Sequence, residues 1–194
     1  MGRRNVLIEG GSGTGKTAVC EELARRGYQA IHGDRELAYQ GDPATGAPVG
    51  GMTGIDLHAH HIWDVDKVRL LVADSREEVT FFCGGSRNLS VFVDLFDGVF
   101  VLEVDDETLV RRLNDRPGDE WGGAGRQTER DLVFELRGHG PDRAGLPSHA
   151  VVINATAPLT DVVDDILVSS RAVPAHSGRE AVGEDEGRGQ HSDR

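Results

Sequence analysis

Cysteines and long apolar runs are scarce in this sequence, and each shortage excludes a class of protein. The two cysteines, Cys20 and Cys83, lie in apolar surroundings and lack the paired spacing of a zinc site. We expect both to be buried and reduced, as in a cytoplasmic protein. No apolar run approaches the ~20 residues that a membrane-spanning helix needs. The N-terminus turns glycine-rich too early for a signal peptide.

Positive charge is also in short supply. The 21 lysines and arginines face 33 aspartates and glutamates, which gives a formal net charge of -12. This balance argues against non-specific affinity for nucleic acid or for anionic membranes, so neither is an expected partner. An anionic small molecule stays open, because a few arginines can dominate one cleft. The oligomeric state is not predicted by any of these features.

The sequence does contain an alternation of short apolar runs with helical patterns. Strands are expected at 5–9, 28–32, 79–83, 99–104 and 151–154, and helices at 18–26, 55–74, 88–96, 105–114, 128–137 and from 160 onward. Continuous apolar strands are typical of a parallel sheet covered on both faces. We therefore predict an α/β, three-layer fold with a five-stranded parallel sheet over residues 1–171, followed by a disordered tail at 172–194.

Several residues mark the ends of these elements. Asp105 and Thr160 are expected as N-caps of their helices, and Gly27 and Gly138 as stops. Residues 41–54 hold too much glycine and proline for regular structure.

The segment GGSGTGKT, residues 10–17, fits the phosphate-binding loop pattern, with an apolar strand before it and a helix after it. Its glycines let the backbone wrap closely, so that successive N–H groups and the helix N-terminus face phosphate oxygens. Lys16 would reach the β- and γ-phosphates, and the Thr17 hydroxyl would ligate Mg²⁺. The expected cofactors are ATP and Mg²⁺. The expected nucleotide contacts are Gly11, Ser12, Gly13, Thr14, Gly15, Lys16, Thr17 and Ala18.

Five segments resemble the adenylate-kinase-like branch of P-loop kinases, which includes nucleoside monophosphate, shikimate and gluconate kinases and chloramphenicol phosphotransferase. They are GGSGTGKT, AIHGDREL, FFCGGSRN, FDGVFVLEVDDETLVRRLNDR and VVINATAPLTDVV, within residues 4–168. The resemblance implies a P-loop NTPase fold that transfers the γ-phosphate of ATP to a small molecule. It also implies an acceptor-binding region at about 35–76 and a short lid at about 116–130.

The resemblance further implies roles for single residues. Asp34, after the second strand, would orient or deprotonate the acceptor hydroxyl or help to hold Mg²⁺. Arg87 would grip an acceptor phosphate or another polar group. Arg112 and Arg116, one helical turn apart, would clamp the transferring phosphoryl group. The segment from Thr156 to Pro158 would lie along the adenine.

The chain also departs from the family pattern. Cys83 stands where nucleotide kinases have a Mg²⁺-associated aspartate, and residues 41–76 match no nucleotide-kinase segment, which favours a non-nucleotide or unusual acceptor. Within that stretch lie His58, His60, His61 and Trp63. The histidines are metal-ligand types, but helical spacing would scatter their rings, so a part in acceptor recognition is the preferred interpretation. Trp121, in the glycine-rich lid, is a candidate to cover the site on closure.

A second function stays open at this point. A phosphate loop also serves ATPases and nucleotide switches that act through a protein partner. No acidic residue of the kind that ATPases carry follows the third strand, which disfavours this alternative. The alternative is not excluded, because the strand expected at 99–104 contains an acidic residue, Glu103, near its end.

Overall fold

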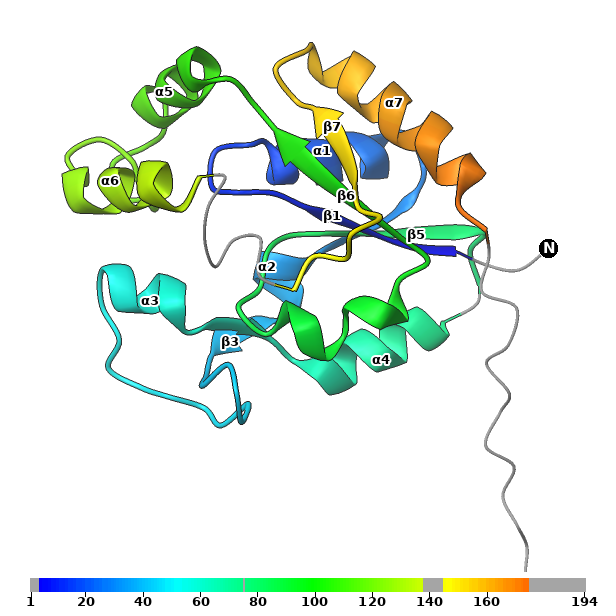
Figure 1. Ribbon diagram of the computed structural model, residues 1–194, viewed down its shortest axis with the longest axis horizontal. Coiled ribbons are helices and arrows are strands. Elements are labelled where there is room, and N and C mark those ends of the chain that lie inside the picture. The colour runs from blue at the N-terminus through cyan, green and yellow to red at the C-terminus, as the bar shows by residue number, and fades with distance from the viewer. Residues whose placement is uncertain (1–3, 75, 138–144, 175–194) are drawn as a thin grey trace, which may run out of the picture.

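A five-stranded parallel sheet forms the centre of the computed structural model, which describes residues 4–74, 76–137 and 145–174 (Figure 1). Its strands are β1 (Arg4–Glu9), β2 (Gln29–His32), β5 (Val79–Cys83), β6 (Gly98–Glu103) and β7 (Val151–Asn154). They lie in the order β2-β5-β1-β6-β7, and every neighbouring pair is parallel. The predicted fold class is confirmed, and all five expected strands agree with the structure to within one residue at each end.

The remaining elements are helices and one short hairpin. The helices are α1 (Lys16–Arg25), α2 (Gly33–Glu36), α3 (Ile55–Ala59), α4 (Val65–Ala73), α5 (Asp106–Asn114), α6 (Gln127–Leu136) and α7 (Leu159–Ala172), with 3₁₀ turns η1 (Leu89–Val91) and η2 (Val93–Leu95). The hairpin pairs β3 (Ala38–Gln40) with β4 (His61–Trp63) in antiparallel fashion.

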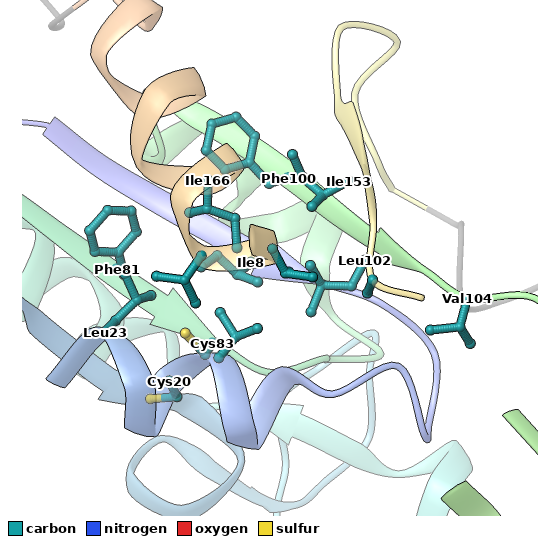
Figure 2. Close-up of a cluster of buried hydrophobic side chains, with 14 of the residues drawn as sticks. Ile8, Cys20, Leu23, Phe81, Cys83, Phe100, Leu102, Val104, Ile153 and Ile166 are labelled. Carbon is teal, nitrogen blue, oxygen red and sulfur yellow. The ribbon is translucent and has the colours of Figure 1, made fainter. Parts of the chain in front are cut away.

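Each face of the sheet carries its own apolar core, because alternate side chains of a strand point to opposite faces. On β1, Val6 and Ile8 face a core shared with α1 and α7, whereas Leu7 faces a second core shared with α4 and the 3₁₀ turns. Figure 2 shows the first core, in which Ile166 of α7 and Leu23 of α1 pack with Phe81 and Ile8 of the strands. The sheet is therefore the middle of three layers, with α1 and α7 packed on one face and α4 and the 3₁₀ turns on the other.

Both cysteines belong to the first core. Cys20 on α1 is 4% exposed and Cys83 on β5 is 1% exposed, and both are free thiols (Figure 2). The expectation that they are buried is confirmed. A hydrogen bond with Cys20, together with burial, raises the pKa of the Cys83 thiol well above its ordinary value. Cys83 is therefore a neutral, apolar part of the core at physiological pH.

The helix predicted over 55–74 is wrong, because three elements occupy that stretch. Ile62 and Trp63, 0% and 1% exposed, leave the helical path to pair with β3 and fill the second core. Asp64 then starts α4 as its N-cap, with its side chain accepting hydrogen bonds from the N–H groups of Asp66 and Lys67. A short strand between two helices can give apolar residues the spacing of one continuous helix, which is why the sequence predicted a helix here.

Two smaller expectations also need correction. The stretch 88–96 forms two 3₁₀ turns in place of a short helix. Thr160 lies inside α7, whose N-cap is Pro158, and the Thr160 hydroxyl bonds to Asp161. Asp105 does cap α5, as expected, by accepting from the Thr108 N–H at 2.7 Å. The stop expected at Gly138 and most of the expected tail lie outside the described residues.

None of the helices in the described ranges combines the length and the apolar character that crossing a membrane would require.

Gly33, at the start of α2, packs so closely on Trp63 that a side chain does not fit. A Cβ built on Gly33 would overlap the Cζ2 and Cη2 atoms of Trp63. We expect Gly33→Ala to lower the free energy of unfolding by about 1–3 kcal/mol, although alanine favours helices, because the buried indole cannot move aside. Gly50→Ala is the control, since nothing lies within 4 Å of its built Cβ. Urea unfolding of both variants measures the difference, and equal midpoints would contradict the packing argument.

Candidate active site around the phosphate loop

A cavity of about 910 Å³ opens at the carboxyl ends of the parallel strands. The phosphate loop forms its floor, and Arg112 and Arg116 of the α5 region border one side. Asp34, Arg87 and His61 border the other. Because the strand order places β1 between β5 and β6, this edge includes the point where the order of the strands reverses, which is where open α/β sheets bind ligands.

The phosphate loop has the backbone that its glycines predict. Gly13 and Gly15 have φ values of 86° and 104°, in the left-handed region that favours glycine. The Lys16 ammonium folds over the loop, with Nζ 2.5 Å from the Gly10 carbonyl oxygen and 3.2 Å from that of Gly11. The ammonium thus lies at the mouth of the loop, where phosphate oxygens can replace the carbonyls as its partners.

Arg112 and Arg116 both reach the loop, as their shared helix face predicts. Arg112 donates to the carbonyl oxygens of Thr14 and Ala155, both at 2.8 Å, and so joins the loop to the end of β7. Arg116 donates to the Ser12 hydroxyl at 3.0 Å. Desolvation by burial lowers the pKa of each guanidinium from its ordinary value. Both stay charged at neutral pH, and an incoming anion would replace the hydration that they have lost.

Asp34 is the acidic residue of the opposite wall. His61 Nε2 lies 3.3 Å from Asp34 Oδ1, and the Gly85 N–H donates to the same oxygen at 3.0 Å. Burial would raise the pKa of this carboxyl, but the His61 hydrogen bond, the Lys16 charge and the Gly85 N–H lower it to about 2. Asp34 is therefore ionised across the physiological pH range, with Lys16 near enough to contribute to that shift.

The His58 side chain contacts both Arg87 and Trp121. Arg87 Nη2 lies 3.2 Å from His58 Nε2, and the His58 ring stacks on Trp121 with centroids 5.3 Å apart and planes at 11°. The Arg87 main-chain N–H donates to the His61 carbonyl oxygen at 2.9 Å. Figure 1 shows α3 and α6 at the same end of the sheet, and the two helices are in contact.

Comparison with known proteins places the chain in a family. The model of a family described as an AAA domain matches residues 6–132, about two thirds of the sequence. The chain belongs to this family of AAA domains. Among solved structures, a sugar kinase from Janibacter sp. HTCC2649 has a TM-score of 0.50 at 17% identity, covering 88% of this chain and 95% of its own. Shikimate kinase from Bacteroides thetaiotaomicron has a TM-score of 0.53 at 18% identity, covering 86% and 97%. No curated protein matches the sequence significantly.

These findings bear on the resemblance drawn from the five sequence segments. The family match spans the phosphate loop, Asp34, Arg87 and both arginines of the α5 region. The two structural neighbours share the fold over nearly their whole length. The assignment of the chain to the P-loop kinase group with adenylate-kinase-like architecture is thereby confirmed at the level of family and fold.

The residues of this AAA domain suit a magnesium ion held with a nucleotide. Thr17 is exposed at the start of α1, and both Thr17 and Asp34 line the cavity. Within the described ranges, no cluster of three or more histidine, cysteine, aspartate or glutamate side chains could hold a metal by itself. Mg²⁺ usually takes only one or two protein ligands and completes its octahedron with phosphates and water. One hydroxyl and one carboxylate fit that pattern.

Three predicted site residues do not line the cavity of the AAA domain. Trp63 is a core residue, 1% exposed and stacked on Phe92 with centroids 5.5 Å apart. Thr156 turns away to accept a hydrogen bond from the Asp105 N–H, and Pro158 caps α7. From the segment expected along the adenine, Ala157 is the residue that lines the cavity.

Glu9 is a cavity residue that the sequence reasoning missed. It is the last residue of β1 and only 4% exposed, and a Cβ built on Gly85 would lie 3.1 Å from both of its carboxylate oxygens. Gly85 therefore lies between two carboxylates, those of Glu9 and Asp34. A charged residue at the end of an otherwise apolar run, directly before a phosphate loop, was the available signal.

Proposed function

We propose that the protein is an ATP-dependent phosphotransferase that moves the γ-phosphate of ATP to a hydroxyl of a small molecule. One observation carries the proposal: a single cavity contains both the phosphate loop and the ionised Asp34. The cavity has a volume at the upper end of the range for ligand sites, which leaves room for a second molecule beside a nucleotide. A site for hydrolysis alone has no need for a second carboxylate-lined compartment.

On the nucleotide side, the proposal assigns the phosphates to the N–H groups of residues 11–18. Lys16, Arg112 and Arg116 neutralise the charge on the transferring group, which is the main source of catalysis in phosphoryl transfer. Thr17 and Asp34 would hold Mg²⁺ through oxygen, and that ion would supply further neutralisation. The adenine lies against Ala157 and Leu159, which line the end of the cavity beyond Arg112.

On the acceptor side, Asp34 receives a hydrogen bond from the acceptor hydroxyl. Its low pKa makes it a weak base, so it orients the oxygen for in-line attack and takes the proton only as the new bond forms. Arg87 supplies a positive charge for a polar or anionic group of the acceptor. The acceptor class is a nucleoside, nucleotide, metabolite or antibiotic hydroxyl, and the names of the two neighbours, a sugar kinase and a shikimate kinase, are in line with it.

In this proposal residues 1–171 form one kinase domain. Residues 35–76 bind the acceptor, and residues 116–130 form the lid. The lid is held by Glu129, which is 7% exposed and accepts from the Gly122 N–H at 2.8 Å and from Arg126 at 2.9 Å. A cytoplasmic location, where ATP is available, is part of the same proposal.

The test is incubation of the protein with ATP, Mg²⁺ and a library of hydroxylated metabolites, nucleosides and antibiotics. Mass spectrometry should detect an acceptor whose mass has risen by one phosphoryl group, together with ADP. Release of ADP and inorganic phosphate with no modified acceptor would favour the ATPase or switch alternative.

Arg112 offers a prediction about nucleotide binding. Replacing it with methionine removes the bridge between Thr14 and Ala155 and one positive charge at the phosphates, so the affinity for ATP should fall about 10- to 100-fold. Arg111→Met is the matched control, because Arg111 is exposed on the same helix and donates to the Thr108 hydroxyl at 3.4 Å. Isothermal titration with ATP compares the two variants, and an equal loss in both would show that only the charge of α5 matters.

A further inference from the structure

We infer that His61 is a positioning residue that turns Asp34 toward the acceptor, and that it does not bind the acceptor itself. The inference rests on the proposed function, because it concerns the aspartate of that same site. It revises the expectation drawn from the sequence, in which His61 was a direct acceptor contact.

The first support is the way in which the Asp34 carboxylate is held. Two hydrogen bonds, from His61 Nε2 at 3.3 Å and from the Gly85 N–H at 3.0 Å, go to Oδ1. In the described part of the chain no hydrogen bond reaches Oδ2, although Asp34 lines the cavity. One oxygen is thus fixed to the protein, and the other is the oxygen that can receive an acceptor hydroxyl.

The second support is the main chain of His61. Its carbonyl oxygen accepts from the Arg87 N–H at 2.9 Å, and its position in β4 is set by pairing with Gln40 of β3. His61 therefore contacts both residues that face the acceptor: Asp34 through its ring and Arg87 through its backbone. Because the hairpin fixes the backbone of His61, it also fixes the spacing of these two groups.

The third support is the charge that competes for Asp34. Lys16 lies near enough for its charge to act on the carboxylate. If nothing held Oδ1, the carboxylate could swing toward this ammonium and neutralise the charge intended for the phosphates. Cys83 and, across Gly85, Glu9 also face Asp34, but neither is a cation that could hold it in place. His61 and Gly85 keep the carboxylate on the acceptor side.

The inference can be tested without knowing the acceptor, by comparing backbone amide resonances in the full-length protein. His61→Leu removes the donor with little change in size, whereas the side-chain amide of His61→Gln places an N–H near the position of Nε2. The Gly85 amide reports on the Asp34 carboxylate, and the Arg87 amide reports on the His61 backbone. We expect the Gly85 resonance to move in the leucine variant and to return in the glutamine variant, while that of Arg87 stays in place.

His60→Gln is the control for the segment, because the His60 ring bonds to the Asp56 carbonyl and His60 does not line the cavity. Movement of both amides in the leucine variant would mean that His61 only supports the hairpin, and movement of neither would mean that it does not hold Asp34. Either result overturns the inference. If the leucine variant does not fold, His61→Asn, whose shorter amide does not reach Asp34, takes its place in the comparison.

Kinetics with an acceptor from the library then add a second measurement. We expect kcat to fall about 10- to 100-fold in His61→Leu, with recovery in His61→Gln and an unchanged KM for ATP. A rise confined to the KM for the acceptor would make His61 a direct contact and would overturn the inference. If the amide result holds but no acceptor is ever phosphorylated, the proposed function fails while the link between His61 and Asp34 stands.

Discussion

Replacing Lys16 with alanine is expected to lower phosphoryl transfer about 10²- to 10³-fold, which is the usual cost of losing one fixed group that stabilises transition-state charge. The Lys16 ammonium lies 2.5 Å from the Gly10 carbonyl and 3.2 Å from that of Gly11, at the mouth of the phosphate loop. His61 and the Gly85 N–H still hold Asp34 in this variant, so the acceptor side of the cavity should be little changed. Initial rates at saturating ATP, together with titration of ATP binding, separate the two effects.

Lys67 supplies the matched control, since it is the only other lysine in the chain and its side chain is 60% exposed on α4. Lys67→Ala should leave transfer and ATP affinity within a factor of about two, because an exposed ion pair such as that with Asp64 contributes little. If Lys16→Ala retained full transfer, the phosphate loop would not be the site of reaction.

The parts of the site that are local in sequence could be predicted from the sequence. The phosphate loop is one continuous segment whose glycines, lysine and threonine each have a chemical reason to be there. Arg112 and Arg116 share a helix face at i and i+4, so their common direction follows from helix geometry. Asp34 is the second residue after β2, and the ends of neighbouring parallel strands meet at one edge of the sheet.

The hairpin of β3 and β4 could not be predicted in the same way. Each strand has only three residues, too few for an alternating pattern to stand out from helical spacing. The partners of Trp63 are also distant in sequence, with Ser86 and Asn88 both within hydrogen-bond distance of its main-chain N–H at 3.0 Å. Tertiary contacts therefore decided the local structure, and Trp63 became a core residue where the sequence suggested a ligand contact.

The contacts that close the acceptor side are non-local as well. His58 stacks on Trp121 across 63 positions of sequence, and it meets Arg87 across 29. A histidine-rich segment and a tryptophan in a glycine-rich loop each drew attention in the sequence. Nothing in the sequence indicated that they form a single wall, because their pairing depends on how α3 and α6 are placed at the end of the sheet.

Replacing Asp34 with asparagine is the prediction that best separates the two candidate functions. The change keeps the shape and removes the charge, so a phosphotransferase should lose about 10²- to 10⁴-fold in transfer, because asparagine cannot take the hydroxyl proton. ATP affinity should stay within a few-fold, since Lys16, Thr17 and the loop are untouched and asparagine keeps one oxygen for Mg²⁺. An ATPase or switch that uses no acceptor predicts little change in hydrolysis. Initial rates of transfer and of phosphate release, measured on the same preparations, distinguish these outcomes.

Asp66→Asn is the matched control, because Asp66 is a carboxylate on α4 whose side chain is 87% exposed and forms an ion pair with Arg69 at 3.1 Å. The same substitution there removes one negative charge far from the cavity. Full activity in Asp66→Asn beside a collapse in Asp34→Asn would tie the loss to position and not to net charge. Unimpaired transfer in Asp34→Asn would instead leave the acceptor hydroxyl without its assigned partner, and Glu9, the second carboxylate beside Gly85, would become the group to replace next.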